Sequence, residues 1–142
     1  PGRSLVVGSG GSELQRLEAL AAGAPNIRFT GWCDEAALQD LLGRCRAVVY
    51  VPRDEDFGIS AVEAMAAGKP VLGVAEGGLL ETVVHGQSGW LMAPDEHPET
   101  LMEGVRQLEA LNPPSLRTAC ETRAGQFDEA IFVQRMQALL AP

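Results

Sequence analysis

A glycine-punctuated stretch, residues 54–81, constrains the fold of this chain more than any other segment. An acidic loop joins the apolar run 47–51 to a run with helical preferences, 58–67. Gly68 is typical of a helix end, and Pro70 prevents the helix from continuing. The order strand, glycine turn, helix therefore predicts one unit of a parallel α/β sheet.

The second half of the stretch repeats this order. An apolar run, 71–74, predicts another strand, and Gly77 and Gly78 form a second turn after it. Helix N-termini then lie at the carboxyl ends of strands, where open α/β sheets bind ligands. These N-termini also favour anions. The stretch therefore predicts a ligand site at this edge of the sheet.

Two carboxylates of the stretch, Glu55 and Glu63, stand eight positions apart. On one continuous helix they would lie about 12 Å apart along the axis and on roughly the same face. That separation is too long for two carboxylates that act across one bond. It suits the two ends of an extended, polyhydroxylated ligand, because a carboxylate accepts hydrogen bonds from hydroxyl groups. The alternative is that residues 54–56 form a solvated loop and that Glu63 is a surface residue of the helix.

Strands and helices are predicted to alternate along the rest of the chain. This alternation predicts a parallel sheet covered on both faces. Asp34 is a candidate N-cap, and Ser12 with Gln15 resembles a capping box. The predicted strands are 3–7, 27–30, 48–51, 71–74 and 90–92, and the predicted helices are 12–22, 35–44, 58–67, 78–84, one from Pro98 to the break at 112–114, 115–124 and 128–140.

Composition indicates an acidic globular chain. Its 142 residues suffice for one domain with a core, and 46% of them are apolar. The net charge of −8 disfavours nucleic acid as a partner, because nucleic acid requires a basic face. No apolar run reaches the length of about 18 residues that a membrane-spanning helix needs.

The cysteines and histidines predict neither disulfides nor a metal site. Cys33, Cys45 and Cys120 are widely spaced without a Cys-x-x-Cys pair, and the histidines are His85 and His97. Free thiols of this kind are typical of a reducing cytosol. We therefore expect a cytoplasmic protein that uses no metal and no cofactor.

The motifs in their order resemble the signature of the retaining glycosyltransferases of family 4, which have the two-domain GT-B architecture. That family carries Glu-x7-Glu, usually as Glu-Gly-Phe-Gly followed by Glu-Ala-Met, then Gly-x-Pro-Val, Gly-Gly-x-x-Glu and Gly-x-x-Gly. The resemblance extends from Leu5 to about Leu108. The matching residues here are Glu55 to Gly58, Glu63 to Met65, Gly68 to Val71, Gly77 to Glu81, and Gly86 with Gly89.

The resemblance implies a fold and a domain organisation. The fold is a Rossmann-like parallel sheet with helices on both faces, that of the C-terminal domain of a GT-B enzyme truncated at its N-terminus. Residues 1–142 would form a single sugar-nucleotide-binding domain. Its first strand-helix unit, which in the family carries an Arg and a Lys for the pyrophosphate, and the N-terminal acceptor domain would be absent from the sequence.

The resemblance also implies roles for particular residues. Glu55 would be the catalytic carboxylate and would bind sugar hydroxyls. Asp56 would add charge beside the sugar, and backbone amides around the next three residues would approach the sugar and the distal phosphate. Glu63 would bind the ribose. The full set of donor-binding candidates is Asp56, Phe57, Gly58, Ile59, Glu63, Gly31 and Trp32, the last two framing the base; for Trp32 a role as a partly buried packing residue stays open.

The implied activity is transfer of a hexose from a nucleotide-diphosphate sugar, with retention of configuration, in polysaccharide biosynthesis. Residues 55–59, Glu-Asp-Phe-Gly-Ile, and residues 77–83 resemble a subgroup of GDP-mannose-dependent mannosyltransferases. The donor would be GDP-mannose or a UDP-sugar, while the acceptor is not specified. Membrane contact, where it occurs, would be peripheral and made through the N-terminal domain, and this part alone would be inactive.

Two other functions remain open. The first is a sugar-nucleotide epimerase or a phosphorylase on the same architecture. The second is a non-catalytic interaction domain. Analysis of the products made by the full-length enzyme would separate these classes.

Overall fold

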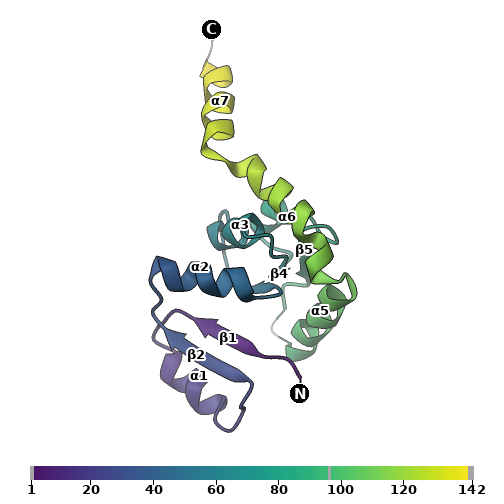
Figure 1. Ribbon diagram of the computed structural model, residues 1–142. Helices are drawn as coiled ribbons and strands as arrows, with labels where there is room; N and C mark the ends of the chain where they lie inside the picture. The colour runs from purple at the N-terminus through teal and green to yellow at the C-terminus, as the bar shows by residue number, and fades with distance from the viewer. Residues whose placement is uncertain (1, 96, 141–142) are drawn as a thin grey trace. The chain divides into compact units, whose positions relative to one another are not determined.

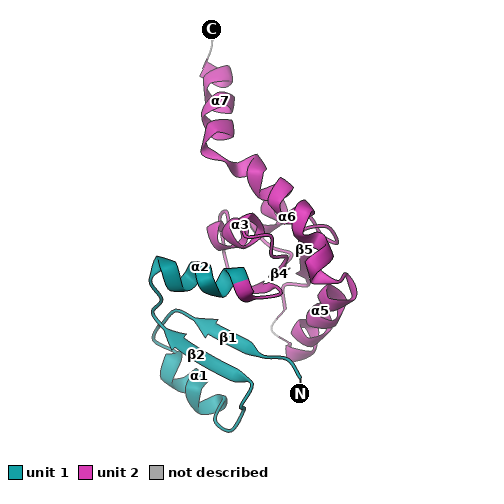
Figure 2. Cartoon of the chain, viewed as in Figure 1, with its two compact units in different colours: residues 1–43 teal, residues 44–142 magenta. Residues whose placement is uncertain are grey.

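The structure, a computed structural model, describes residues 2–95 and 97–140. Parallel strands alternate with helices along the chain (Figure 1). The chain divides into two compact units, residues 1–43 and residues 44–142 (Figure 2).

The first unit is built on a two-stranded parallel sheet. Strand β1 (Leu5–Gly8) pairs with β2 (Ile27–Gly31), and helix α1 (Leu14–Leu20) connects them. Helix α2 (Glu35–Arg44) follows and extends to the boundary with the second unit. Asp34 caps α2 as predicted, since the backbone N–H of Ala37 donates to its Oδ1 at 2.8 Å.

The capping box predicted from Ser12 and Gln15 is wrong. The N-cap of α1 is Glu13, in a helical conformation, and no side chain bonds to the helix start. Glu13 is instead engaged by Arg16, whose Nε donates to Glu13 Oε2 at 2.5 Å. This exposed ion pair holds the glutamate over the first turn of the helix.

The second unit contains a three-stranded parallel sheet in the order β3-β4-β5. The strands are β3 (Val48–Tyr50), β4 (Val71–Val74) and β5 (Gly89–Met92). All four residues of the central strand β4 are buried. The helices are α3 (Ile59–Ala66), α4 (Leu79–Thr82), α5 (Pro98–Ala110), α6 (Arg117–Ala124) and α7 (Glu129–Leu140), with the 3-10 turns η1 (Pro113–Leu116) and η2 (Gly125–Phe127).

The core of the second unit lies between β4 and the helices. Met65 of α3, Leu72 of β4 and Leu79 of α4 are fully buried. Helix α5 packs against β4 and β5 at Gly104, where an added Cβ would lie 2.8 Å from Leu72 Cδ1. A side chain at position 104 would therefore require a shift of the Leu72 side chain or of α5.

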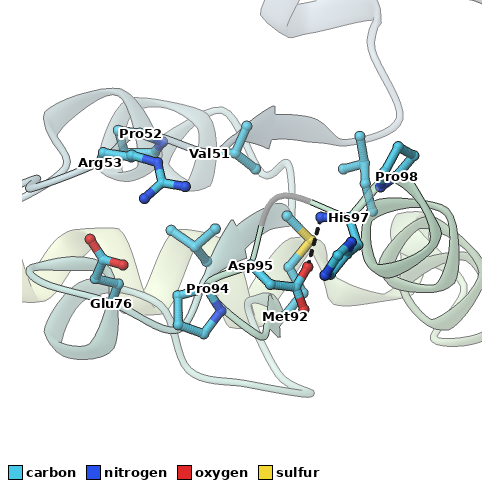
Figure 3. Close-up of a pocket in the computed structure, with 11 residues that line it drawn as sticks. Val51, Pro52, Arg53, Glu76, Met92, Pro94, Asp95, His97 and Pro98 are labelled. Carbon is cyan, nitrogen blue, oxygen red and sulfur yellow. Dashed lines mark hydrogen bonds between the residues drawn. The ribbon is translucent and has the colours of Figure 1, made fainter.

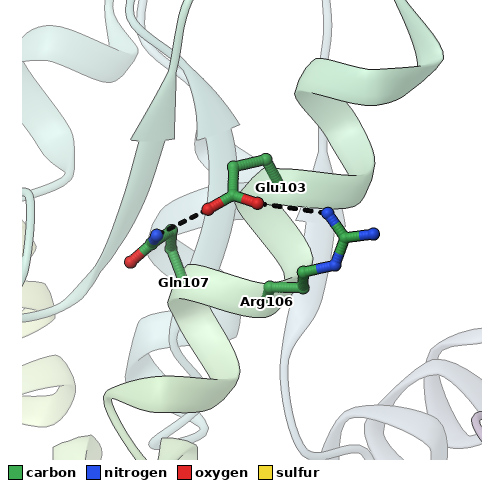
Figure 4. A network of polar contacts seen from close by, with 3 residues as sticks. All are labelled: Glu103, Arg106 and Gln107. Atoms are coloured by element: carbon green, nitrogen blue, oxygen red, sulfur yellow. Dashed lines mark hydrogen bonds and ion pairs between the residues drawn. The ribbon is translucent and has the colours of Figure 1, made fainter.

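A polar network on α5 marks the solvent side of that helix (Figure 4). Glu103 accepts from Gln107 Nε2 at 2.6 Å and from Arg106 Nη1 at 3.1 Å. The bond from Gln107, followed by that from Arg106, lowers the pKa of Glu103. Pairs at this helical spacing stabilise a helix only slightly, so this network is a surface feature and not a site.

The hydrogen bonds of the strands give two sheets, which the alternation of elements alone does not specify. Strand β1 pairs with β2, and β3 pairs with β4. Among the described residues, no strand pairs with the second edge of either β1 or β3. The assignment of residues 1–142 to a single domain therefore stays a prediction.

Neither a membrane span nor a metal cluster is found in the part of the chain that the structure describes. No helix in residues 2–95 and 97–140 is long and apolar enough to cross a bilayer. The same residues hold no group of three metal-ligating side chains. Cys33, Cys45 and Cys120, which all lie within the described residues, form no disulfide there.

Cys120 gives a prediction about alkaline stability. Its side chain is fully buried in α6, and burial, with a smaller contribution from the charge of Glu121, raises the pKa of this thiol to about 11. In the unfolded chain a thiol loses its proton near pH 8.5. Between these values the unfolded state binds fewer protons than the folded state, so stability falls as the pH rises from about 8.5 to 11.

We expect the Cys120→Ala variant to lose stability less steeply over this range than the wild type. Thermal denaturation between pH 8 and 11 in the presence of a reductant measures the two slopes. Equal slopes would show that the thiol of Cys120 does not titrate differently on folding.

Candidate functional site

The acidic loop leads from the end of β3 into the first turn of α3. Gly58 is the N-cap of α3 and adopts a left-handed conformation with φ of +86°. An added Cβ at this position would lie 2.9 Å from Leu79 Cδ2. Both the conformation and the close packing require glycine. The sequence prediction that Gly58 begins this helix is therefore confirmed.

Glu55 turns its carboxylate back onto this helix start. Its Oε1 accepts from the backbone N–H of Gly58 at 3.0 Å and from that of Phe57 at 3.3 Å. Its Oε2 accepts from the hydroxyl of Tyr50 at 2.5 Å. These three bonds lower the pKa of Glu55, and the bond from Tyr50 makes the largest contribution. The carboxylate is therefore ionised at neutral pH and fixed in orientation.

Tyr50 is a site residue that the sequence analysis missed. It is the last residue of β3 and the only tyrosine of the chain. The bond to Glu55, burial, and the charges of Glu55 and Glu63 raise its pKa, while a side-chain bond with Ser60 acts in the opposite direction. A signal existed in the sequence, because a tyrosine that ends a half-buried strand needs a partner for its hydroxyl.

The same hydroxyl relates the two ends of the Glu-x7-Glu motif. Glu55 contacts Tyr50 directly, and Glu63 is close enough for its charge to raise the pKa of Tyr50. Glu63 is exposed on α3. The charges of both carboxylates thus raise the pKa of one hydroxyl at the end of β3, while a shared ligand for Glu55 and Glu63 stays a prediction.

The turn of Gly77 and Gly78 packs directly against the acidic loop. The N–H of Gly78 donates to the carbonyl of Glu55 at 2.7 Å. An added Cβ on Gly77 would lie 2.4 Å from that carbonyl oxygen, and one on Gly78 would lie 2.5 Å from Phe57 Cα. Backbone meets backbone here, which only glycine permits. The Gly-Gly motif therefore supports the loop that carries Glu55.

A second support comes from the C-terminal part of the unit. The ring of Phe57 meets that of Phe127 edge-on, with centroids 5.4 Å apart. The guanidinium of Arg123 lies 4.9 Å above the Phe127 ring and donates to the carbonyls of Thr82 and Glu81 at the end of α4. Helix α6 and the turn η2 thus contact both the acidic loop, through Phe57, and the end of α4.

A cavity of about 320 Å³ opens at the carboxyl ends of β3, β4 and β5 (Figure 3). Its walls are apolar, and its polar groups come from Arg53, Glu76, Asp95 and His97. Glu76 also accepts from the backbone N–H of Asp54 at 3.3 Å, which links this cavity to the acidic loop. The described lining residues are Val51, Pro52, Arg53, Val74, Glu76, Met92, Pro94, Asp95, His97, Pro98 and Leu101.

Asp95 organises the α5 side of this cavity. It accepts from the backbone N–H of His97 at 3.0 Å and from the hydroxyl of Thr100 at 3.0 Å. Both bonds lower the pKa of Asp95, and the bond from His97 contributes more than the bond from Thr100. Pro98 stands in the first turn of α5, as predicted.

The predicted site residues divide between the two units. The second unit brings together those from Glu55 to Glu63, with Gly58 buried and Ile59 65% exposed. In the first unit, Gly31 has φ of +65° and Trp32 is 83% exposed. An added Cβ on Gly10 would lie 2.9 Å from Trp32 Nε1, so the turn after β1 supports this indole. The exposure of Trp32 makes the packing alternative wrong within the described residues.

Comparison with known proteins agrees with this arrangement of motifs. The family model described as "Glycosyl transferases group 1" matches residues 3–127. An α-1,3/1,6-mannosyltransferase of Neurospora crassa is 33% identical over 104 residues, which cover 70% of this chain and 22% of that protein. A D-inositol 3-phosphate glycosyltransferase of Jonesia denitrificans is 36% identical over 107 residues, 73% of this chain and 25% of that protein. The chain thus spans a quarter or less of these relatives.

Solved structures confirm the fold class predicted from the sequence. The sucrose-phosphate synthase of Thermosynechococcus elongatus superposes with a TM-score of 0.76 at 31% identity, over 95% of this chain and 37% of that one. The Anabaena protein HepE, in complex with UDP, superposes with a TM-score of 0.81 at 24% identity, over 99% of this chain and 41% of that one. Parallel strands with helices on both faces are therefore a GT-B-type, Rossmann-like arrangement. The family resemblance seen in the motifs is confirmed as well: the chain belongs to the glycosyl transferases group 1 family.

Proposed function

We propose that this chain is the donor-binding part of a retaining glycosyltransferase that moves a hexose from a nucleotide-diphosphate sugar to an acceptor. The observation that carries the proposal is the fixed carboxylate of Glu55. It is ionised, accepts three hydrogen bonds, and lies where β3 passes into α3. A carboxylate fixed in this way accepts hydrogen bonds from sugar hydroxyls without paying for its own reorientation.

The other residues of the second unit take the roles that the family resemblance implies. Glu63 binds the ribose hydroxyls, and Asp56 lies beside the sugar. The amides of Phe57 and Gly58 donate to Glu55 in this structure, so the amide of Ile59 is the candidate contact for the distal phosphate. Charge develops on the diphosphate as it leaves, and fixed dipoles at a helix start stabilise such charge.

In this proposal, Trp32 and Gly31 of the first unit bind the nucleoside base. Trp32 offers an exposed aromatic face, which suits stacking on a base, and the left-handed Gly31 turns the chain beside it. Relatives that are named as mannosyltransferases favour GDP-mannose as the donor. A UDP-sugar is the second candidate, because HepE has been solved with UDP and with UDP-glucose.

The remainder of the enzyme is part of this proposal. The chain covers 22% and 25% of the two curated relatives described above, which supports a further strand-helix unit with pyrophosphate-binding bases and an N-terminal acceptor domain. The second edges of β1 and β3, which no described strand pairs with, can accept a strand from such a unit. Three cysteines that form no disulfide among the described residues support a cytoplasmic location.

The test of the function uses the full-length protein. Calorimetric titration with GDP-mannose, GDP, UDP-glucose and UDP identifies the donor, and product analysis with a mixture of saccharide acceptors identifies the reaction. Transfer with retained anomeric configuration supports the proposal. Isomerisation of the donor or phosphorolysis would identify an epimerase or a phosphorylase, and absence of binding to all four nucleotides would favour a non-catalytic domain.

A further inference from the structure

The hydroxyl of Tyr50 is the contact that joins the sheet to the proposed catalytic carboxylate. Tyr50 stands at the end of β3 and pairs with Gly73 of β4 in the parallel ladder. Glu55 stands in the loop that follows, and its Oε2 accepts from Tyr50 at 2.5 Å. A side chain on a strand is held more precisely than one on a loop. The strand thus supplies a fixed point for a group that the loop alone would leave free to rotate.

The hydrogen bonds of Glu55 are divided unequally between its two oxygens. A carboxylate oxygen has two lone-pair positions. Oε1 already accepts from two backbone amides, those of Phe57 and Gly58, whereas Oε2 accepts from the hydroxyl of Tyr50. Oε2 is therefore the oxygen with a position left for a ligand hydroxyl. The bond from Tyr50 fixes the direction in which that position points.

The surroundings of Tyr50 keep its hydroxyl a donor. Glu55, burial and Glu63 raise the pKa of Tyr50, so the phenol remains protonated at neutral pH. The same bond lowers the pKa of Glu55, so the partner remains a carboxylate. A bond between a neutral donor and an ionised acceptor is among the stronger ones in proteins.

We propose that Tyr50 is a positioning residue, whose hydroxyl holds Oε2 of Glu55 so that this oxygen receives a hydroxyl of the donor hexose. The proposal rests on the function proposed above, since it requires a sugar at Glu55. It separates two parts of the donor: the hexose depends on the bond between Tyr50 and Glu55, while the nucleoside diphosphate does not.

The test compares two ligands on the full-length Tyr50→Phe variant, which loses one hydroxyl. The affinity for GDP-mannose and the kcat/KM for transfer are expected to fall about tenfold, which is the effect of losing one ordinary charge-assisted hydrogen bond. The affinity for GDP is expected to stay within about twofold. UDP-glucose and UDP replace this pair if the wild type prefers uridine. Ser115→Ala, which removes a hydroxyl from η1, is the matched control.

A double-mutant cycle with Glu55→Gln shows whether Tyr50 acts through Glu55. We expect the double variant to be no worse than Glu55→Gln alone. An equal loss for GDP and GDP-mannose, additive losses in the cycle, or unchanged transfer by Tyr50→Phe would each overturn the positioning role. If the wild type neither binds a sugar nucleotide nor transfers a sugar, the proposed function fails, and the role of Tyr50 fails with it.

Discussion

Replacing Gly78 with alanine is expected to lower the free energy of unfolding by about 3 kcal/mol, the upper end of the cost of overpacking. The new Cβ would lie 2.4 Å from the carbonyl oxygen of Asp56 and 2.5 Å from Phe57 Cα. These are backbone atoms, so no side-chain rotation can relieve the clash. The N–H of Gly78 also donates to the carbonyl of Glu55 at 2.7 Å, so moving the two backbone segments apart to relieve the clash lengthens this bond.

Gly125→Ala is the matched control in the same unit. Gly125 has helical backbone angles, with φ of −58°, and nothing lies within 4 Å of its added Cβ. Its replacement is expected to leave stability unchanged or to raise it by less than about 1 kcal/mol. Urea denaturation followed by circular dichroism measures both variants. A stability of Gly78→Ala equal to that of Gly125→Ala would show that the acidic loop moves aside freely.

Most elements of this fold could be predicted from the sequence because local signals define them. Strand β4 and helix α2 have the predicted bounds. An apolar run followed by Gly77 and Gly78 marks β4, and the Asp34 N-cap marks the start of α2. Residues 12–15 were misleading, because a Ser and a Gln at capping-box spacing do not show which donor the side chain reaches. The division into two sheets depends on pairing between distant segments, which periodicity does not encode.

The residue types of the candidate site could be proposed from the sequence, but their contacts could not. The spacing of Glu55 and Glu63 predicts that both serve one extended ligand, and in the structure Glu55 lies in the loop before α3 while Glu63 is exposed on that helix. The partner of Glu55 could not be inferred from spacing, because the bond from Tyr50 depends on how the loop folds back on the strand. The contact of Phe57 with Phe127 joins residues 70 positions apart, and only the packing of α6 and η2 reveals it.

Replacing Glu55 with alanine is expected to lower kcat/KM for hexose transfer by about 10²- to 10³-fold in the full-length enzyme, as for the loss of one preorganised polar group at a reacting centre. The variant removes the acceptor that the hexose needs and leaves the amides of Phe57 and Gly58 without their internal partner. Those amides become available to an anion. The affinity for the nucleoside diphosphate alone should therefore stay equal or increase, while the affinity for the sugar nucleotide falls.

Glu55→Gln separates the charge from the shape. Hydrogen bonds lower the pKa of Glu55, so the wild-type carboxylate is ionised at neutral pH, and the amide reproduces no state that the enzyme populates there. An amide has one acceptor oxygen where the carboxylate has two, so it cannot serve both the helix start and Tyr50. We expect Glu55→Gln to lose nearly as much transfer activity as Glu55→Ala, and Glu103→Gln on the surface of α5 to lose none. Glu63→Ala should lower the affinity for the nucleoside diphosphate and the affinity for the sugar nucleotide equally, because the ribose contact is common to both ligands. Full transfer activity in either Glu55 variant would mean that the carboxylate only caps α3, and the hexose would then have to be bound by other groups.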